Sequence, residues 1–200
     1  MKYVKMLGLA ALAAMAVMAL VGAGTASATE LYSGATTLKA GTEVDASVTG
    51  SSFKMSTTEN AVLDECAGGT IKGKTSNNGS STETVKGSVA KVDLTWSSCT
   101  RPTETLAGGT LEIHYTSGLN GTVTASGLEI TINTIPFGTC TYITTSGTSL
   151  GSLTGSTTSN AVLHINTTAT LKSGPACPAD ARWIATYTVT SPKPLHVTTS

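Results

Sequence analysis

The chain has 200 residues, with 12 basic and 12 acidic side chains and a formal net charge of zero. Such sparse and balanced charge excludes a protein that binds nucleic acid through clustered Lys and Arg, and it excludes a polybasic protein of the membrane surface. The apolar residues are rich in Val, Ile and Leu, so we expect a folded core in place of a disordered chain.

The first 28 residues have the features of a secretory signal peptide. Lys2 and Lys5 give a positive start, residues 6–24 carry no charge, and Ala26-Ser27-Ala28 has the small-x-small pattern of a cleavage site. We therefore expect residues 1–28 to be removed and the mature protein to be secreted without a membrane span. The alternative is a leader that is retained as an anchor, because its uncharged run approaches the thickness of a bilayer.

The remaining 172 residues include 58 Ser or Thr and carry a net charge of about −2. No stretch among them has apolar residues at helical spacing, whereas period-two alternation recurs throughout, which predicts an all-β protein. Thr suits this fold because its branched Cβ favours a strand and its hydroxyl tolerates solvent. We therefore interpret much of the Ser and Thr content as strand surface.

Alternation and turn signals divide the chain into short strands. In chain order the expected strands are Glu43–Val48, Ser52–Thr57, Thr70–Lys74, Val85–Trp96 with a bulge near Ala90 and Lys91, Leu111–Tyr115, Thr122–Ala125, Leu128–Ile132, Thr139–Ile143, Leu163–Leu171 and Trp183–Val189. The Gly-rich stretch 147–155 is interpreted as turns or flexible loop, and the segment 191–200 as a Pro-containing tail.

The regular turn spacing predicts an antiparallel β-sandwich, Greek-key or immunoglobulin-like, of about 10–12 strands. We expect a single domain over residues 29–200, because either half alone would have a small, Gly-rich core. The alternative is two lobes that divide near residues 101–104.

Four cysteines in an exported chain predict two disulfides. The residues Cys66, Cys99, Cys140 and Cys177 are too widely spaced for a zinc site, which needs close pairs. Three pairings are open. We favour Cys66 with Cys99 and Cys140 with Cys177, because pairing between cysteines close in sequence is commonest in a strand meander.

Few residues are candidates for catalysis or for binding a cofactor or a metal. His114 and His164 fall on the polar phase of their strands and His196 lies in the tail, so we expect three surface histidines with no catalytic role. Asp64 and Glu65 are adjacent and would point to opposite faces of a strand, which disfavours an acid/base pair. No G-x-S-x-G elbow is present. We therefore predict no catalytic, cofactor-binding or metal-binding residue and no enzymatic activity.

The two tryptophans of the chain, Trp96 and Trp183, lie close in sequence to Cys99 and Cys177. Packing of each indole against a disulfide in the core is the favoured interpretation. The alternative is a pair of exposed rings on which a sugar would stack.

Short motifs give a resemblance to known proteins. Leu63-x-x-Cys66, Trp96-Ser97-Ser98-Cys99-Thr100, Gly138-Thr139-Cys140-Thr141-Tyr142 and Cys177-Pro178 look like segments of small secreted β proteins from high-GC Gram-positive bacteria. The chain is also distantly similar to the PraB family. The resemblance implies a secreted single domain without an assigned molecular function, in the PraB case linked to the extracellular matrix and to growth on hydrocarbons. It carries over no functional residue.

The function predicted first is that of a secreted, non-enzymatic cell-surface or extracellular-matrix protein. Its strand edges could pair with further copies of the chain or with other surface components. The second hypothesis is an extracellular binding module for a carbohydrate or an apolar ligand, which exposed aromatic side chains would favour. The third is a secreted hydrolase, which a cleft containing a His and two carboxylates would favour.

Overall fold

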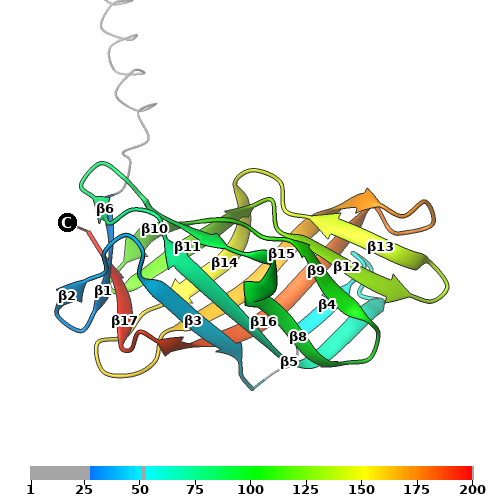
Figure 1. Ribbon diagram of the computed structural model, residues 1–200, viewed down its shortest axis with the longest axis horizontal. Coiled ribbons are helices and arrows are strands. Elements are labelled where there is room, and N and C mark those ends of the chain that lie inside the picture. Colours follow the sequence, from blue (N-terminus) through cyan, green and yellow to red (C-terminus); the bar gives the residue numbers. More distant parts are fainter. Residues whose placement is uncertain (1–27, 51–52, 200) are drawn as a thin grey trace, which may run out of the picture.

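The computed structural model describes residues 28–50 and 53–199 (Figure 1). The predicted leader, residues 1–28, lies outside the described residues except for Ala28. Within the described part the chain forms strands and a single 3-10 turn, η1 (Lys91–Asp93). None of the described segments is a helix with the length and apolar character needed to cross a membrane.

The all-β prediction is confirmed, but the β-sandwich is wrong because eight strands close into an antiparallel barrel. These strands are β3 (Glu43–Val48), β5 (Val62–Thr75), β7 (Val85–Val89), β10 (Gly109–Ser117), β11 (Asn120–Ser126), β14 (Thr148–Thr154), β15 (Val162–Ser173) and β16 (Asp180–Ser191). Each pairs with the next in this order, and β16 pairs back with β3. A sandwich would leave edge strands that this ring does not have.

The strand β3 closes the barrel, because it pairs with β5 on one side and with β16 on the other. Ala46 lies opposite Ile71 of β5 on one side and opposite Val189 of β16 on the other. Alternation specifies which face of a strand is buried, and that face is the same for a sandwich and for a barrel. The long-range pairing of β3 with β16 therefore could not be read from the local pattern.

Beyond one end of the barrel, β5, β15 and β16 continue into a second group of strands, here called the sheet extension. Its other members are β4 (Phe53–Ser56), β8 (Leu94–Cys99), β9 (Thr103–Ala107), β12 (Glu129–Thr134) and β13 (Gly138–Ile143). The order is β8-β5-β4-β16-β15-β13-β12-β9. Residues 101–104, the alternative lobe boundary, cover the end of the loop after the edge strand β8 and the first two residues of the edge strand β9.

At the opposite end, a small sheet here called the cap covers the barrel (Figure 1, left). It consists of β1 (Thr29–Ser33), β2 (Thr36–Thr37), β6 (Gly79–Ser80) and β17 (Leu195–Thr198). The predicted C-terminal tail therefore includes a strand, β17. The Gly-rich stretch 147–155 is also not a loop, since it contains the barrel strand β14.

Most of the expected strands are present with boundaries close to those predicted. The expected strand Val85–Trp96 is an exception, because the bulge predicted near Ala90 and Lys91 is a full break. The turn η1 separates β7, which pairs with both β10 and β5, from β8, which pairs with β5. The change of alternation phase thus marked the end of the pairing with β10.

Both disulfides that the sequence favours are formed, and both lie in the sheet extension. Cys66–Cys99 joins β5 to β8, and Cys140–Cys177 joins β13 to the loop between β15 and β16. The core of the extension contains Phe53, Trp96 and Trp183, whose ring centroids lie 4.1 to 6.0 Å apart. Trp183 thus packs on other aromatic rings in the interior.

Candidate ligand-binding cavity

The barrel encloses an apolar cavity of about 90 Å³ next to the cap. Each of the eight barrel strands contributes to its wall, and Leu31 and Leu195 of the cap close its end. Leu111 and Ile113 of β10 point inward as the alternation predicts, and they are only half-buried because they border this space. A protein interior is normally packed without such voids, so the cavity needs a physical account.

The inward face of the cavity wall offers no free polar side chain to a ligand. Thr75 is the one polar residue on the inward face of its wall, and its hydroxyl donates to the carbonyl of Lys39 at 2.7 Å and accepts from the N–H of Thr42 at 3.0 Å. A ligand group with unpaired donors or acceptors would lose its hydrogen bonds to water on entering. The part of a ligand that enters must therefore be apolar.

Two glycines lie in the wall where β5 meets β7, a place here called the seam. Two residue pairs join these strands, Lys74 with Ser88 and Thr75 with Gly87, and the N–H of Ser76 donates to the carbonyl of Lys86 at 2.7 Å. Gly73 and Gly87 lie on the inward face and place no side chain over the cavity. Lys74, Lys86 and Ser88, whose side chains are exposed on the outer face, border the cavity as well.

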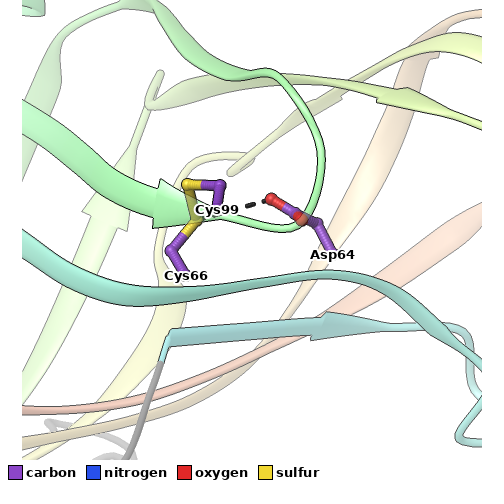
Figure 2. A group of neighbouring side chains, drawn as sticks. All are labelled: Asp64, Cys66 and Cys99. Atoms are coloured by element: carbon purple, nitrogen blue, oxygen red, sulfur yellow. Dashed lines mark hydrogen bonds between the residues drawn. A yellow bond between two sulfur atoms is a disulfide. The ribbon is translucent and has the colours of Figure 1, made fainter.

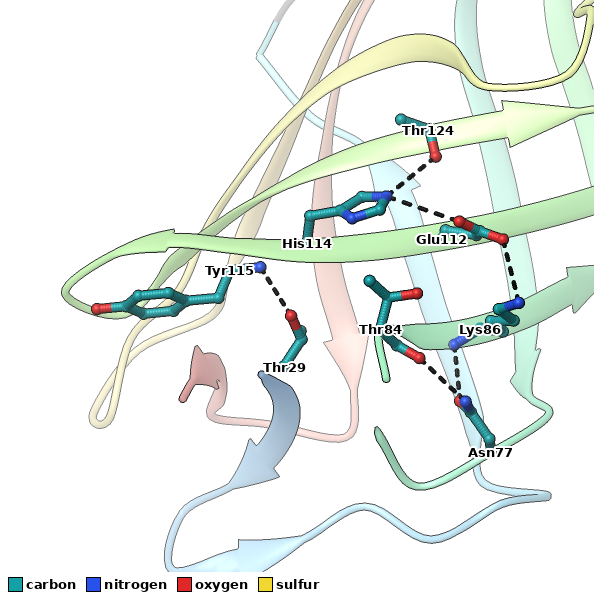
Figure 3. A network of polar contacts seen from close by, with 8 residues as sticks. All are labelled: Thr29, Asn77, Thr84, Lys86, Glu112, His114, Tyr115 and Thr124. Carbon is teal, nitrogen blue, oxygen red and sulfur yellow. Dashed lines mark hydrogen bonds and ion pairs between the residues drawn. The ribbon is translucent and has the colours of Figure 1, made fainter. Parts of the chain in front are cut away.

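Polar contacts on the outer surface hold β7 to both of its neighbours, β10 and β5 (Figure 3). Lys86 Nζ lies 3.6 Å from a carboxylate oxygen of Glu112, whose other oxygen lies 3.7 Å from Nε2 of His114. The side chain of Asn77 accepts from the N–H of Lys86 at 2.8 Å and donates to the carbonyl of Thr84 at 3.0 Å. The Glu112 contact thus joins β7 to β10, whereas Asn77, which follows β5, joins β7 to the end of β5, next to the bond between the Ser76 N–H and the Lys86 carbonyl.

A second cluster, Asp64 with the Cys66–Cys99 disulfide, has the residue types of a metal site (Figure 2). Both sulfurs are oxidised, so neither offers the thiolate that a metal would need. The carboxylate of Asp64 is fully buried and accepts from the Thr100 hydroxyl at 2.7 Å, the Arg101 N–H at 2.9 Å and the Thr103 hydroxyl. Asp64 thus anchors the loop between β8 and β9.

The three histidines do not come together. His114 is half-buried beside Glu112, and His164 is exposed beside the Thr186 hydroxyl at 3.3 Å. His196 is buried in β17 and stacks on Tyr32 with ring centroids 5.6 Å apart, so its expected position on the surface is wrong. Among the described residues, no His has two carboxylates in ion-pair contact.

The aromatic side chains lie mostly inside the molecule. Trp183, Tyr142 and Tyr187 are fully buried, and Trp96 is half-buried with its indole N–H donating to the Thr105 hydroxyl at 3.1 Å. A sugar-stacking surface requires accessible ring faces. The rings on which the carbohydrate hypothesis depended are therefore used for packing.

Two buried tyrosines should lose their protons at a higher pH than a free tyrosine does. Burial, with a smaller contribution from Asp180, raises the pKa of Tyr142 from 10.0 to about 12, and burial raises the pKa of Tyr187 above its ordinary range. Because the folded-state pKa of Tyr142 exceeds that of the unfolded chain, its contribution to stability is complete below pH 10 and is lost as the pH rises toward about 12.

We expect tyrosinate absorbance to show the ionisation of Tyr142 as a separate step near pH 12. The variant Tyr142→Phe should lack this step. An alkaline titration of the folded protein in which Tyr142→Phe and the wild type give the same curve would contradict the assignment. Circular dichroism recorded along the titration separates ionisation of the folded protein from alkaline unfolding.

Fold and cavity together define a closed eight-stranded antiparallel β-barrel with an apolar interior and a disulfide-bonded sheet extension. No protein-family model matches the chain, and neither a curated protein nor a solved structure shows significant similarity to it. The resemblance to the PraB family and to proteins of high-GC Gram-positive bacteria therefore stays a prediction.

Sequence reasoning missed the cavity, although one signal was present. Val85, Gly87 and Val89 share one phase of their strand, and Gly73 shares the phase of Ile71. A glycine in the buried phase of a strand marks a missing side chain or a close approach of another backbone or a ligand. Two such glycines on paired strands indicated a gap, but only the pairing of β5 with β7 places them together.

Proposed function

We propose that this protein is an extracellular, non-enzymatic binding protein that holds a small apolar ligand, or the apolar end of a larger one, inside its β-barrel. The observation that carries the proposal is the apolar cavity next to the cap. An eight-stranded barrel is just wide enough for its side chains to fill it or for one small ligand to occupy it. Here the side chains leave part of the space open.

The size of the cavity limits the ligand. Its 90 Å³ is smaller than the roughly 150 Å³ engineered cavity that accommodates benzene, which leaves room for about four carbon atoms of a chain. Burial of four methylene groups provides roughly 3 kcal/mol, at about 0.8 kcal/mol for each. A short alcohol or alkane should therefore bind with a dissociation constant of about 6 mM.

The two disulfides support an oxidising compartment. The cell-surface and matrix hypothesis has less support, because it depended on free strand edges and the eight barrel strands have none. The edges β8 and β9 of the extension are joined by side-chain bonds. Trp96 donates to the Thr105 hydroxyl, and that hydroxyl donates to the carbonyl of Leu94 at 2.7 Å.

Filling the cavity with a protein side chain should abolish binding. Ala46 of β3 is buried and lines the cavity, so Ala46→Leu adds three carbon atoms to the space that the ligand needs. We expect 1-hexanol to shift the amide resonances of cavity residues such as Val123 and Leu163 in the wild type. In Ala46→Leu the apparent affinity should fall at least tenfold.

The matched control is Ala67→Leu, the same chemical change at an exposed position of β5. This variant should bind 1-hexanol like the wild type. The proposal fails if 1-hexanol causes no saturable shifts at cavity residues of the wild type, or if Ala46→Leu binds it as well as Ala67→Leu does.

A further inference from the structure

A second, much smaller cavity of about 10 Å³ lies behind the first one inside the barrel. It is lined by aliphatic residues and by Trp183, which is fully buried. On β7, Val85 and Gly87 line the larger cavity, whereas Val89 lines the smaller one. Because successive inward residues of a strand follow its axis, the two cavities lie in series from the cap toward the sheet extension.

Three aliphatic side chains lie between the two cavities and form a constriction, here called the neck. They are Ile71 of β5, Leu111 of β10 and Leu163 of β15, and each of them lines both cavities. Their strands are spread around the ring of eight, so the three side chains meet from different sides of the interior. Aliphatic side chains in a core change rotamers, which allows a slender chain to pass the neck but hinders a branched group.

The cap and the barrel wall close off the larger cavity. Leu31 and Leu195 of the cap are each 1% exposed, and the N–H of Tyr115 donates to the Thr29 hydroxyl at 3.0 Å (Figure 3). Each barrel strand is paired with both of its neighbours, and this includes β5 and β7 at the seam. An enclosed apolar cavity can still bind a small apolar molecule, but the part of the ligand inside must match the shape of the interior.

The two volumes determine how long such a chain can be. The larger cavity has room for about four carbon atoms, and a cavity of about 10 Å³ holds about one group of the size of a water molecule. A methyl group is of similar size. A chain that fills the larger cavity, passes the neck and ends in the smaller cavity therefore has about six carbon atoms in a row.

On the basis of the proposed function, we propose that the barrel recognises an unbranched alkyl chain of about six carbon atoms, whose terminal methyl group passes the neck and occupies the smaller cavity. The neck residues Ile71, Leu111 and Leu163 then determine specificity against branched chains. Each further methylene group that is buried increases the affinity about fourfold. A branched isomer that stops at the neck does not obtain this increase.

The shape of the site is tested with three alcohols, namely 1-butanol, 1-hexanol and 3,3-dimethyl-1-butanol, which is an isomer of 1-hexanol with a branched end. All three have the same hydroxyl group, so differences in their binding report on the carbon chain. In amide-shift titrations, 1-hexanol should bind at least about fourfold more tightly than 1-butanol and shift the resonances of Val89 and Leu150 at the smaller cavity. The branched isomer should bind no better than 1-butanol and leave these resonances in place.

Two substitutions test the smaller cavity and the neck separately. Val89→Ile adds one carbon atom at the smaller cavity, so 1-hexanol should lose its advantage over 1-butanol. Val62→Ile is the matched control, the same change at an exposed position of β5, and it should bind the alcohols like the wild type. Leu111→Val removes one carbon atom from the neck and should strengthen binding of 3,3-dimethyl-1-butanol several-fold. Thermal unfolding checks that each variant is folded.

The results distinguish the shape of the ligand from the existence of the site. Equal affinities of 1-hexanol and its branched isomer in the wild type, or an undiminished advantage of 1-hexanol in folded Val89→Ile, would overturn the unbranched chain while the apolar cavity proposal stood. Binding of 1-butanol without binding of 1-hexanol would do the same, because the chain would then end at the neck. Absence of saturable shifts with all three alcohols would instead overturn the proposed function itself.

Discussion

Replacement of Cys66 and Cys99 together by Ala is expected to lower the free energy of unfolding by about 3.5 to 4 kcal/mol. The disulfide closes a loop with a sequence separation of 33, and its loss returns the corresponding conformational freedom to the unfolded chain. It also joins an edge strand, since β8 pairs only with β5. The edge of the extension should therefore separate first in this variant.

Urea denaturation measures the effect as a lower midpoint. Cys140→Ala with Cys177→Ala is the comparison, because that disulfide has a similar sequence separation of 37 but joins the inner strand β13 to a loop. Similar losses would show that loop length dominates. A loss below about 1 kcal/mol for the Cys66–Cys99 variant would contradict the expectation from loop closure.

Asp64→Ala is the second substitution with a large expected effect, a loss of about 3 kcal/mol in the free energy of unfolding. The variant leaves three donors without their acceptor, namely the Thr100 and Thr103 hydroxyls and the Arg101 N–H. Hydrogen bonds to a charged acceptor contribute more than neutral ones, at about 1.5 to 3 kcal/mol each. Water reaches part of this loop and can bond to some of the three donors. The expected loss is therefore smaller than the sum of the three hydrogen-bond contributions.

Asp64→Asn should cost roughly half as much, because it keeps one carbonyl oxygen as an acceptor. Glu104→Ala is the control, since Glu104 is an exposed carboxylate of the neighbouring strand β9, and it should change stability by less than about 0.5 kcal/mol. Equal stability of Asp64→Ala and Glu104→Ala would show that the buried carboxylate does not anchor the loop.

Asp64 and the Cys66–Cys99 disulfide support the same connection between β8 and β9. Asp64 Oδ2 lies 3.4 Å from Cys66 Sγ, so the two substitutions share a site. Their effects should not add, and the sum of the single losses should exceed the loss of the combined variant.

The sequence predicted most of the individual strands correctly because alternation is a local property. Leu111 and Ile113, for example, point inward as their phase requires. Closure of the barrel depends on the pairing of β3 with β16, which lie far apart in the chain, and no local pattern specifies it. The Gly-rich segment that became β14 was missed because Gly and Ser are rare in strands.

The candidate site was predictable only in part. The inward phase of Gly73 and Gly87 can be read from the sequence, but a cavity is what remains after the side chains of eight strands have been placed. Small differences in their volumes determine whether it is filled. His196 was placed on the surface because a neighbouring Pro194 suggested a tail, whereas pairing of β17 with β1 buries it.

The two disulfides divide the molecule into a cross-linked and an uncross-linked part. Both covalent links lie in the sheet extension, whereas the barrel strands β7, β10, β11 and β14 are held by hydrogen bonds and packing alone. Separation of these four strands breaks no covalent bond, so reduction of the disulfides should loosen the extension and leave their hydrogen bonds unchanged.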